Sequence, residues 1–325
     1  MSIPFGAEYQ KENVEMRAAY VDAQRELIAK GLPIMLLTAD LGFACGLLDV
    51  LKEDPKHALN MGIAEQNMAS FAAGLSLTGK IPFVHTFACF CSRRAHDQLY
   101  ISGSYAKLNL KIVGTDPGVS AALNGGTHSC MDDISTFRAF PEITIVEPTD
   151  STMLRKLIPQ IANEYGVHYI RLYRKNAIRI YDEDAEFKIG KSMKLREGKD
   201  ITLIASGMCV YEALQAAEIL SKEGIGARVL DMFTIKPLDK DAVLEAASKT
   251  GAIVTAENHT VIGGLGSAVS ELVSQYHPAI VGKVGIQDLF GEVGDERFLM
   301  ERFGLKAESI VKKAQEVLQI KKEIH

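Results

Sequence analysis

The feature that most constrains the fold is an alternation of short β-type runs with helical patterns, which occurs twice along the chain. Such alternation is typical of parallel strands joined by crossover helices. The sequence therefore predicts an α/β protein of two doubly wound domains with mostly parallel sheets. Helices are expected from about Glu65, from about Met208 to Glu223, and from Asp239. The expected strands are residues 34–41, 81–88, 110–116, 143–148, 167–173, 201–207, 227–233, 252–258 and 281–288.

A polar, strongly charged segment over residues 181–200 separates the two halves and shows little helical periodicity. This composition predicts an interdomain linker followed by an edge hairpin. We expect a first domain over residues 1–180, a linker over 181–199 and a second domain over 200–325.

The overall composition excludes several classes of function. The net charge is -5, and no Lys/Arg cluster is interleaved with aromatic residues, so a nucleic-acid partner is not expected. No apolar run approaches the roughly 18 residues of a membrane span, and the N-terminus lacks the order of a signal peptide. The 5 cysteines are an odd number without a zinc-type spacing, which favours reduced thiols and no metal site. We therefore expect a cytoplasmic protein with no membrane partner.

Glu65 is a single carboxylate in an otherwise apolar and small-residue run, N-M-G-I-A-E-Q-N-M-A-S-F-A-A-G-L. A carboxylate at a helix start can simply stabilise the helix dipole. However, Glu65 heads a helical row of small residues, which would let a flat ligand approach. Burial would raise the pKa of such a carboxyl group and suit it to proton transfer.

Two further segments contain candidate site residues, one of them aromatic and the other Gly-rich. Phe87 and Phe90 lie three residues apart, and they form either ordinary core or a stacking shelf for a planar ring. The Gly-rich run 124–128 ends in His128 and follows an expected strand, where open parallel sheets bind ligands. By contrast, V-I-G-G-L-G-S-A-V (261–269) lacks the dinucleotide spacing G-x-G-x-x-G, and we expect a tight turn at a helix start.

Taken together, these segments resemble the C-terminal half of transketolase, in the form of the pyrimidine-binding subunit found where the enzyme is split into two chains. The resemblance covers nearly the whole chain. The matching stretches are T-A-D-L (38–41), N-M-G-I-A-E-Q-N-M (60–68), I-P-F-V-H-T-F-A-C-F (81–90), R-A-H-D-Q-L (94–99), N-L-K-I-V-G-T-D-P-G-V (109–119), G-G-T-H (125–128), R-A-F-P-E-I-T-I-V-E-P-T-D (138–150), Y-I-R-L-Y-R (169–174), D-M-F-T-I-K-P-L-D (231–239) and A-E-N-H-T-V-I-G-G-L-G-S-A-V (256–269).

The resemblance implies a thiamine diphosphate cofactor, whose aminopyrimidine ring this chain contacts through a pyrimidine-binding domain, and a transketolase C-terminal domain. It also implies transfer of a two-carbon glycolaldehyde unit from a ketose to an aldose. Glu65 matches the catalytic glutamate, and His128 matches a histidine that handles substrate hydroxyls, with His259 a weaker candidate. The implied cofactor contacts are Asp40, Ile63, Glu65, Phe87 and Phe90. The implied substrate contacts are Arg17, His85, Asp116, Asn124, His128 and Arg174.

Thiamine enzymes hold the diphosphate and its divalent ion through a G-D-G motif, which is absent from this sequence; the nearest match is Gly294-Asp295-Glu296. The resemblance therefore implies a second chain, the diphosphate-binding subunit, that carries the diphosphate-binding domain and the Mg²⁺ or another divalent ion. We expect a heterodimer or heterotetramer in which this chain is inactive without that partner.

Departures from the family pattern bear on the substrate. The family's G-E-D-G-x-T-H-Q is replaced by residues 122–129, A-L-N-G-G-T-H-S, which lose both acids, and Asp116 stands where a phosphate-side histidine is typical. A carboxylate beside a phosphate dianion is repulsive unless it pairs with Arg17 or Arg174. We therefore expect a non-standard sugar, such as 6-deoxy-6-sulfofructose or apulose 4-phosphate. Three alternatives remain open: a conventional pentose-phosphate transketolase chain, part of another thiamine enzyme such as a deoxyxylulose phosphate synthase-like fragment, and a non-catalytic assembly protein.

Overall fold

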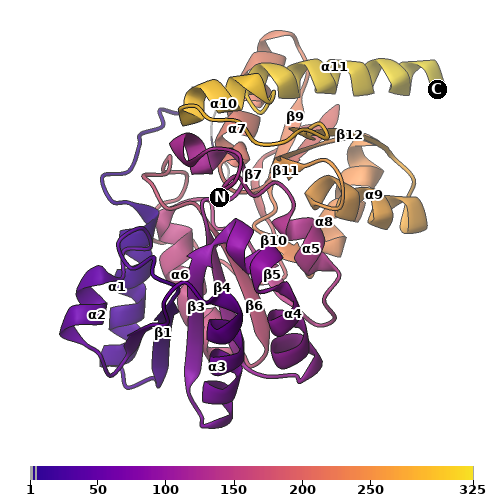
Figure 1. The fold of residues 1–325 in the computed structure, drawn as a ribbon. Helices are drawn as coiled ribbons and strands as arrows, with labels where there is room; N and C mark the ends of the chain where they lie inside the picture. The colour runs from indigo at the N-terminus through magenta and orange to yellow at the C-terminus, as the bar shows by residue number, and fades with distance from the viewer. Residues whose placement is uncertain (1–2, 4–5, 325) are drawn as a thin grey trace.

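Two sheets organise the chain, of which a computed structural model describes Ile3 and residues 6–324 (Figure 1). The seven-stranded sheet has the order β10-β5-β6-β4-β3-β1-β2, and all its pairings are parallel except that of β10 with β5. The strands are β1 (Ile34–Thr38), β2 (Ala58–Asn60), β3 (Ile81–Phe87), β4 (Leu110–Thr115), β5 (Thr144–Val146), β6 (Val167–Leu172) and β10 (Thr234–Lys236).

Helices cover both faces of the seven-stranded sheet because its strands are apolar on both faces. One face of β1, β3 and β4 contributes Leu36, Phe83 and Val113 to the cluster under α1 and α6. The opposite face contributes Leu37, Val84 and Ile112 to the cluster under α3. The helices of this half are α1 (Met16–Ala29), α2 (Leu48–Glu53), α3 (Glu65–Leu77), α4 (His96–Gln98), α5 (Asp133–Arg138) and α6 (Ser151–Asn163).

The five-stranded sheet has the order β12-β11-β8-β9-β7. Its strands are β7 (Met193–Arg196), β8 (Ile201–Ala205), β9 (Ala227–Asp231), β11 (Ala252–Thr260) and β12 (Ile280–Ile286). Its helices are α7 (Cys209–Lys222), α8 (Lys240–Thr250), α9 (Leu265–Tyr276), α10 (Glu296–Arg302) and α11 (Ala307–Ile324). The predicted class of two α/β domains with mostly parallel sheets is confirmed.

Three details of the strand pattern differ from the sequence-based expectations. The short strands β2 and β10 were not anticipated, because three residues are too few to show a period. The charged segment contains β7, which pairs antiparallel with β9 in place of a hairpin. Because β10 comes from the second half of the chain and pairs with β5, it joins the first sheet to the second half.

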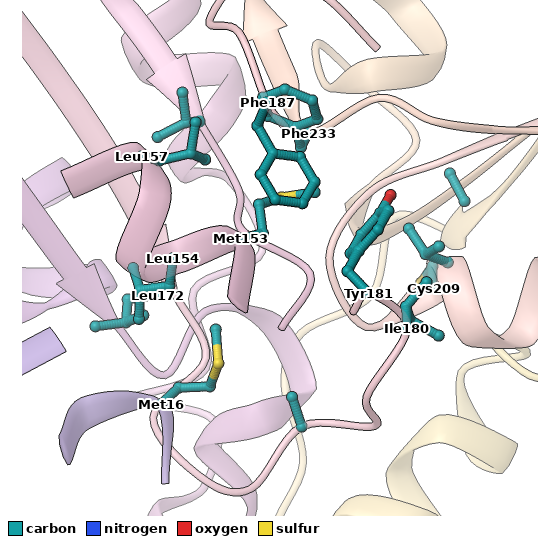
Figure 2. Close-up of a cluster of buried hydrophobic side chains, with 14 of the residues drawn as sticks. Met16, Met153, Leu154, Leu157, Leu172, Ile180, Tyr181, Phe187, Cys209 and Phe233 are labelled. Atoms are coloured by element: carbon teal, nitrogen blue, oxygen red, sulfur yellow. The ribbon is translucent and has the colours of Figure 1, made fainter. Parts of the chain in front are cut away.

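A buried apolar cluster fills the junction between the two halves (Figure 2). It brings α1 and α6 together with residues 180–187 and with the start of α7. The members labelled in Figure 2 are Met16, Met153, Leu154, Leu157, Leu172, Ile180, Tyr181, Phe187, Cys209 and Phe233. This continuous core holds the two sheets in one arrangement, so side chains from both can contribute to one site.

The Gly-rich run 261–269 forms a turn at the start of α9, as expected. The carboxylate of Glu257 accepts hydrogen bonds from the backbone N–H groups of Leu265 (2.7 Å) and Gly266 (2.8 Å). A Cβ atom on Gly264 would lie 2.0 Å from Glu257 Oε2, so the Glu257 side chain leaves room only for glycine at this position. No helix within the described ranges is long and apolar enough to cross a membrane.

Candidate functional site

Most of the residues singled out in the first domain lie at one edge of its sheet. Asp40 follows β1, Glu65 follows β2, Phe87 ends β3, Asp116 follows β4 and Arg174 follows β6. These strands are mutually parallel, so their carboxyl ends meet at the same edge, the usual position of ligand sites in open α/β sheets. The fold therefore brings together residues that are far apart in the sequence.

Glu65 is the first residue of α3 and is 1% exposed. Arg94, from the π-helical segment Phe90–Arg94, donates a hydrogen bond from Nη1 to Glu65 Oε1 at 2.7 Å. Glu65 Oε2 is buried and has no hydrogen-bond partner among the described residues. A buried carboxylate oxygen without a partner is costly unless a ligand completes its hydrogen bonding. Glu65 thus has one oxygen held by the protein and one available to a ligand.

An aromatic group lies beside this carboxylate and consists of Phe87, Phe90 and His128. The two phenyl centroids are 5.8 Å apart, and the His128 ring meets both edge-on, at 5.7 Å from Phe87 and 5.4 Å from Phe90. The guanidinium of Arg94 lies 4.3 Å from the Phe90 centroid, which connects the aromatic group to Glu65. The stacking-shelf interpretation of the two phenylalanines therefore has a geometric basis, because they accompany a carboxylate and a histidine.

Asn60, which was not predicted as a site residue, organises the turn before α3. Its Nδ2 donates to Asp40 Oδ1 at 3.0 Å, and its Oδ1 accepts from the backbone N–H groups of Asp40 and Gly62, both at 3.0 Å. Ile63 follows and is 76% exposed. The position of Asn60 at the head of the run N-M-G-I-A-E was the available signal, since Asn often bonds the backbone of a following turn.

The two arginines expected to bind an acidic group lie next to each other at the ends of α1 and β6. The backbone N–H of Arg17 donates to the carbonyl of Arg174 at 3.2 Å. Arg174 Nε lies 3.0 Å from Asp116 Oδ1, and its guanidinium lies 5.6 Å from the Phe87 centroid. The expected pairing of Asp116 with one of the arginines thus occurs. Because Arg174 also contacts Phe87, it connects the two arginines to the aromatic group.

Each of these arginines has its own carboxylate. Glu15, which was also not predicted as a site residue, accepts from Arg17 Nε at 2.6 Å. Burial raises the pKa of Asp116 to about 6, although Arg174, Lys175 and Arg17 oppose this shift. Arg17 also donates to the carbonyls of Phe43 (3.2 Å) and Ala44 (3.0 Å). The positive charge of the two guanidinium groups is therefore largely balanced by carboxylates of the protein itself.

The segment after β4 carries the remaining predicted substrate residues. Asn124 is exposed at the end of the 3₁₀ segment Gly118–Asn124, and His128 lies four residues further on. Thr127 Oγ1 and His128 Nδ1 are 2.9 Å apart, so a hydroxyl hydrogen bond can orient the ring. The ring that contacts the two phenylalanines is thus oriented by its preceding residue.

The structure does not bring His85 or His259 to this group. The ring of His85 has no exposed surface, meets Tyr20 edge-on at 4.9 Å and has a pKa lowered to about 3 by burial. His259 is also fully buried, and burial lowers its pKa to about 4. Both rings stay neutral in packed surroundings, apart from the residues that the structure brings together.

Among the described residues, no cluster of His, Cys, Asp and Glu could hold a metal ion. In Gly294-Asp295-Glu296, the nearest match to G-D-G, Asp295 is the N-cap of α10 and accepts from Phe298 N at 2.9 Å. Asp295 therefore has a structural role.

These features fit the aminopyrimidine ring of thiamine diphosphate. The unpartnered Glu65 Oε2 could meet a ring nitrogen, and Phe87 and Phe90 offer apolar surface for the ring itself. The aliphatic side chain of Ile63, largely exposed in the same turn, adds apolar surface.

Comparison with known proteins agrees with this geometry. The model of the transketolase pyrimidine-binding domain matches residues 12–178, and that of the transketolase C-terminal domain matches residues 190–310. A 6-deoxy-6-sulfo-D-fructose transketolase subunit from Clostridium sp. (strain MSTE9) is 49% identical, with 99% of each chain covered. An apulose-4-phosphate transketolase subunit from Phocaeicola vulgatus is 37% identical, and the match covers 94% of this chain and 98% of that one.

A solved structure described as a split gene transketolase, inactive beta4 tetramer, superposes with a TM-score of 0.86 and 41% identity. The alignment covers 95% of this chain and 99% of that one. Both domain models, their order and the full-length coverage agree. The chain therefore belongs to the transketolase family and has the domain content of its split-gene subunits.

Proposed function

We propose that this chain is the pyrimidine-binding subunit of a split, thiamine-diphosphate-dependent transketolase that transfers a two-carbon glycolaldehyde unit from a non-standard ketose to an aldose. The diphosphate-binding subunit supplies the site for the diphosphate and the divalent ion. Five unpaired cysteines agree with a reducing, cytoplasmic location, which is part of the proposal.

The pyrimidine-side chemistry is assigned to Glu65 and the aromatic group. When bound, thiamine diphosphate supplies the electron sink for cleavage of the carbon–carbon bond. Glu65 holds a proton at the ring nitrogen through Oε2, while Arg94 fixes Oε1. Phe87 and Phe90 orient the ring and exclude water from this hydrogen bond. His128, beside both rings, is placed to exchange a proton with a substrate hydroxyl.

The observation that carries the substrate proposal is the charge balance at Arg17 and Arg174. Each guanidinium is paired, with Glu15 at 2.6 Å and with Asp116 at 3.0 Å. A phosphate dianion gains most from unpaired cations and is repelled by a nearby carboxylate. A sulfonate carries a single negative charge and needs less compensation. We therefore favour a sulfonated ketose such as 6-deoxy-6-sulfofructose, and the name of the 49% identical relative supports this choice.

A phosphorylated branched sugar such as apulose 4-phosphate is the second candidate. It is supported by the presence of both arginines side by side and by the name of a 37% identical relative. Turnover of 6-deoxy-6-sulfofructose, fructose 6-phosphate and apulose 4-phosphate by the assembled enzyme decides between them. A large preference for either phosphate ester would defeat the sulfonate proposal.

The partner requirement is tested by mixing the two purified chains. We expect ketol transfer only when this chain, the diphosphate-binding subunit, thiamine diphosphate and Mg²⁺ are all present. The related structure described as an inactive β4 tetramer supports this expectation. Ketol transfer by this chain alone would contradict it. A complex that needs both chains but keeps full activity with Glu65→Gln would instead give this chain an assembly role.

A further inference from the structure

The segment 117–131, which carries Asn124 and His128, begins in the first domain but is held by the second. At its start, Asn258 near the end of β11 accepts from Val119 N at 2.9 Å and donates from Nδ2 to the carbonyl of Pro117 at 3.0 Å. At its end, the N–H of Thr260 donates to the carbonyl of Met131 at 2.8 Å. Both ends of the segment are therefore tied to one short stretch of the same strand.

The fit around Asn258 is close. Gly118 has φ +58, and a Cβ atom there would lie 2.1 Å from Asn258 Oδ1 and 2.4 Å from its backbone oxygen. Asn258 is only 1% exposed, and its carbonyl accepts from Arg171 Nη2 at 2.7 Å. Arg171 is itself held by ion pairs to Asp133 and Glu147. Asn258 is thus fixed in place, and its side chain hydrogen-bonds the backbone on both sides of Gly118.

The middle of the segment also packs against the second domain. A Cβ atom on Gly126 would lie 2.3 Å from the carbonyl oxygen of Gly291, so the two backbones are in direct contact. Val119 and Met131 enter a buried apolar cluster with residues of β12, α10 and the turn after α10. This packing leaves Asn124 exposed and His128 half-buried against Phe87 and Phe90.

The backbone of the segment requires this support. Ala122 has φ 49 and ψ -116, a sparsely populated conformation for a residue with a side chain. Such conformations persist only where the surrounding structure holds them. The hydrogen bond from Val119 N to Asn258, three residues before Ala122, is part of the structure that holds this conformation.

We propose that Asn258 is a positioning residue through which the C-terminal domain sets the sugar selectivity of the site, by holding segment 117–131 so that Asn124 and His128 meet the substrate hydroxyls. This inference rests on the proposed function, because it takes both residues to be sugar contacts. It gives the C-terminal domain a part in substrate recognition that acts through the first domain's segment rather than through a sugar contact of Asn258 itself.

The activity test compares two donors with the assembled two-chain enzyme. A ketose donor has hydroxyls beyond the transferred unit, whereas hydroxypyruvate gives the same two-carbon unit with release of CO₂ and lacks them. We expect Asn258→Asp and Asn258→Ala to lower kcat/KM for the ketose on the order of 100-fold, because small displacements of positioning groups have effects of this size. Release of CO₂ from hydroxypyruvate, measured without an aldose acceptor because an aldose also carries hydroxyls, should change little. Equal losses with both donors, or no loss with either, would overturn the inference.

The control is Asn163→Asp, the same change at an exposed residue whose side chain caps a carbonyl of its own helix. It should leave both donors unaffected.

A second measurement needs no catalysis and only this chain. Hydrogen exchange followed by mass spectrometry should show faster amide exchange over residues 117–131 in Asn258→Asp and Asn258→Ala than in the natural protein. The exchange rate of this segment should be unchanged in Asn163→Asp. Unchanged exchange in both Asn258 variants would overturn the support role, whatever the enzyme's substrate. Failure of the proposed function has a different signature: His128→Ala would then keep full ketose turnover while exchange in the segment still responds to Asn258.

Discussion

Arg174 Nε lies 3.0 Å from Oδ1 of Asp116, a carboxylate with 1% exposed surface at the end of the neighbouring strand β4. Under the proposed function an incoming anionic group meets Arg174, and Asp116 then competes with the substrate for the same guanidinium. Arg17 is paired with Glu15 in the same way. The proposed function therefore predicts that anion binding at this site depends on the charge of the substrate and on the ionisation of Asp116.

Replacing Asp116 by Asn should shift the enzyme toward phosphorylated ketoses. The substitution removes the negative charge beside Arg174 while keeping the shape of the side chain, so the repulsion of a dianion is lost. We expect the ratio of kcat/KM for fructose 6-phosphate to that for its sulfonate analogue to rise about tenfold, equivalent to ~1.4 kcal/mol. Asp184→Asn changes the net charge equally in an exposed part of the charged segment and should leave the ratio unchanged. An unchanged ratio in Asp116→Asn would contradict the charge-balance argument.

The pH dependence of sulfonate binding should report the same carboxyl group. Burial raises the pKa of Asp116 to about 6, so the group is ionised at pH 7.5 and becomes neutral as the pH falls through 6. A sulfonate stays monoanionic throughout, and protonation of Asp116 releases Arg174 to it. The KM for the sulfonated ketose should therefore fall between pH 7.5 and 5.5 in the natural protein, and this trend should vanish in Asp116→Asn. Steady-state kinetics at constant ionic strength make the comparison, and the same slope in both proteins would rule out Asp116 as its source.

Changing Glu65 to Gln should remove activity without unfolding the protein. Gln fills the same space but cannot exchange a proton at the cofactor ring, and we expect kcat to fall by at least about 100-fold. The side chain of Arg94 is 45% exposed and can be solvated when its partner is lost, so the melting temperature should hardly change. Glu53→Gln removes an exposed ion pair with Arg25 and serves as the control for both measurements. Retained activity in Glu65→Gln would favour an assembly role.

Arg171 should be essential for stability rather than for chemistry. It is fully buried and bonds Asp133 and Glu147, and the Arg171 guanidinium holds the pKa of Asp133 below its usual value against the effect of burial. Arg171→Met would leave two buried carboxylates without their cation, at a cost of about 3–5 kcal/mol in the free energy of unfolding. Because a depressed carboxyl pKa stabilises the fold above the unfolded pKa, the stability lent by Asp133 should be lost on acidification.

Urea unfolding at pH 7 and at a series of pH values descending below about 4, the ordinary pKa of an Asp side chain, tests this prediction. Arg25→Met breaks only the exposed pair with Glu53 and should cost less than about 1 kcal/mol. Similar costs for the two arginine variants would show that the buried network is not a major source of stability.

Much of the architecture was predictable because it is encoded locally. The apolar runs found in the sequence correspond to strands such as β3 and β8, and α3 begins at Glu65 as expected. The same local signals marked Phe87, Phe90 and His128, which the structure brings within about 6 Å of each other as ring centroids. The class of cofactor followed from the resemblance that these motifs carry.

Local patterns were thus enough to predict two α/β domains of the transketolase type, with Glu65 at the start of its helix, because periodicity and motif order are properties of neighbouring residues. Three contacts became visible only in the folded chain: Asp116 pairs with Arg174, His85 is buried against Tyr20, and Asn258 hydrogen-bonds the segment that carries His128. Each of these contacts joins side chains or backbone groups that are 58 or more residues apart, and nothing in the local pattern specifies such a partner. They arise because parallel strands align their carboxyl ends and a shared core fixes the second domain against the first.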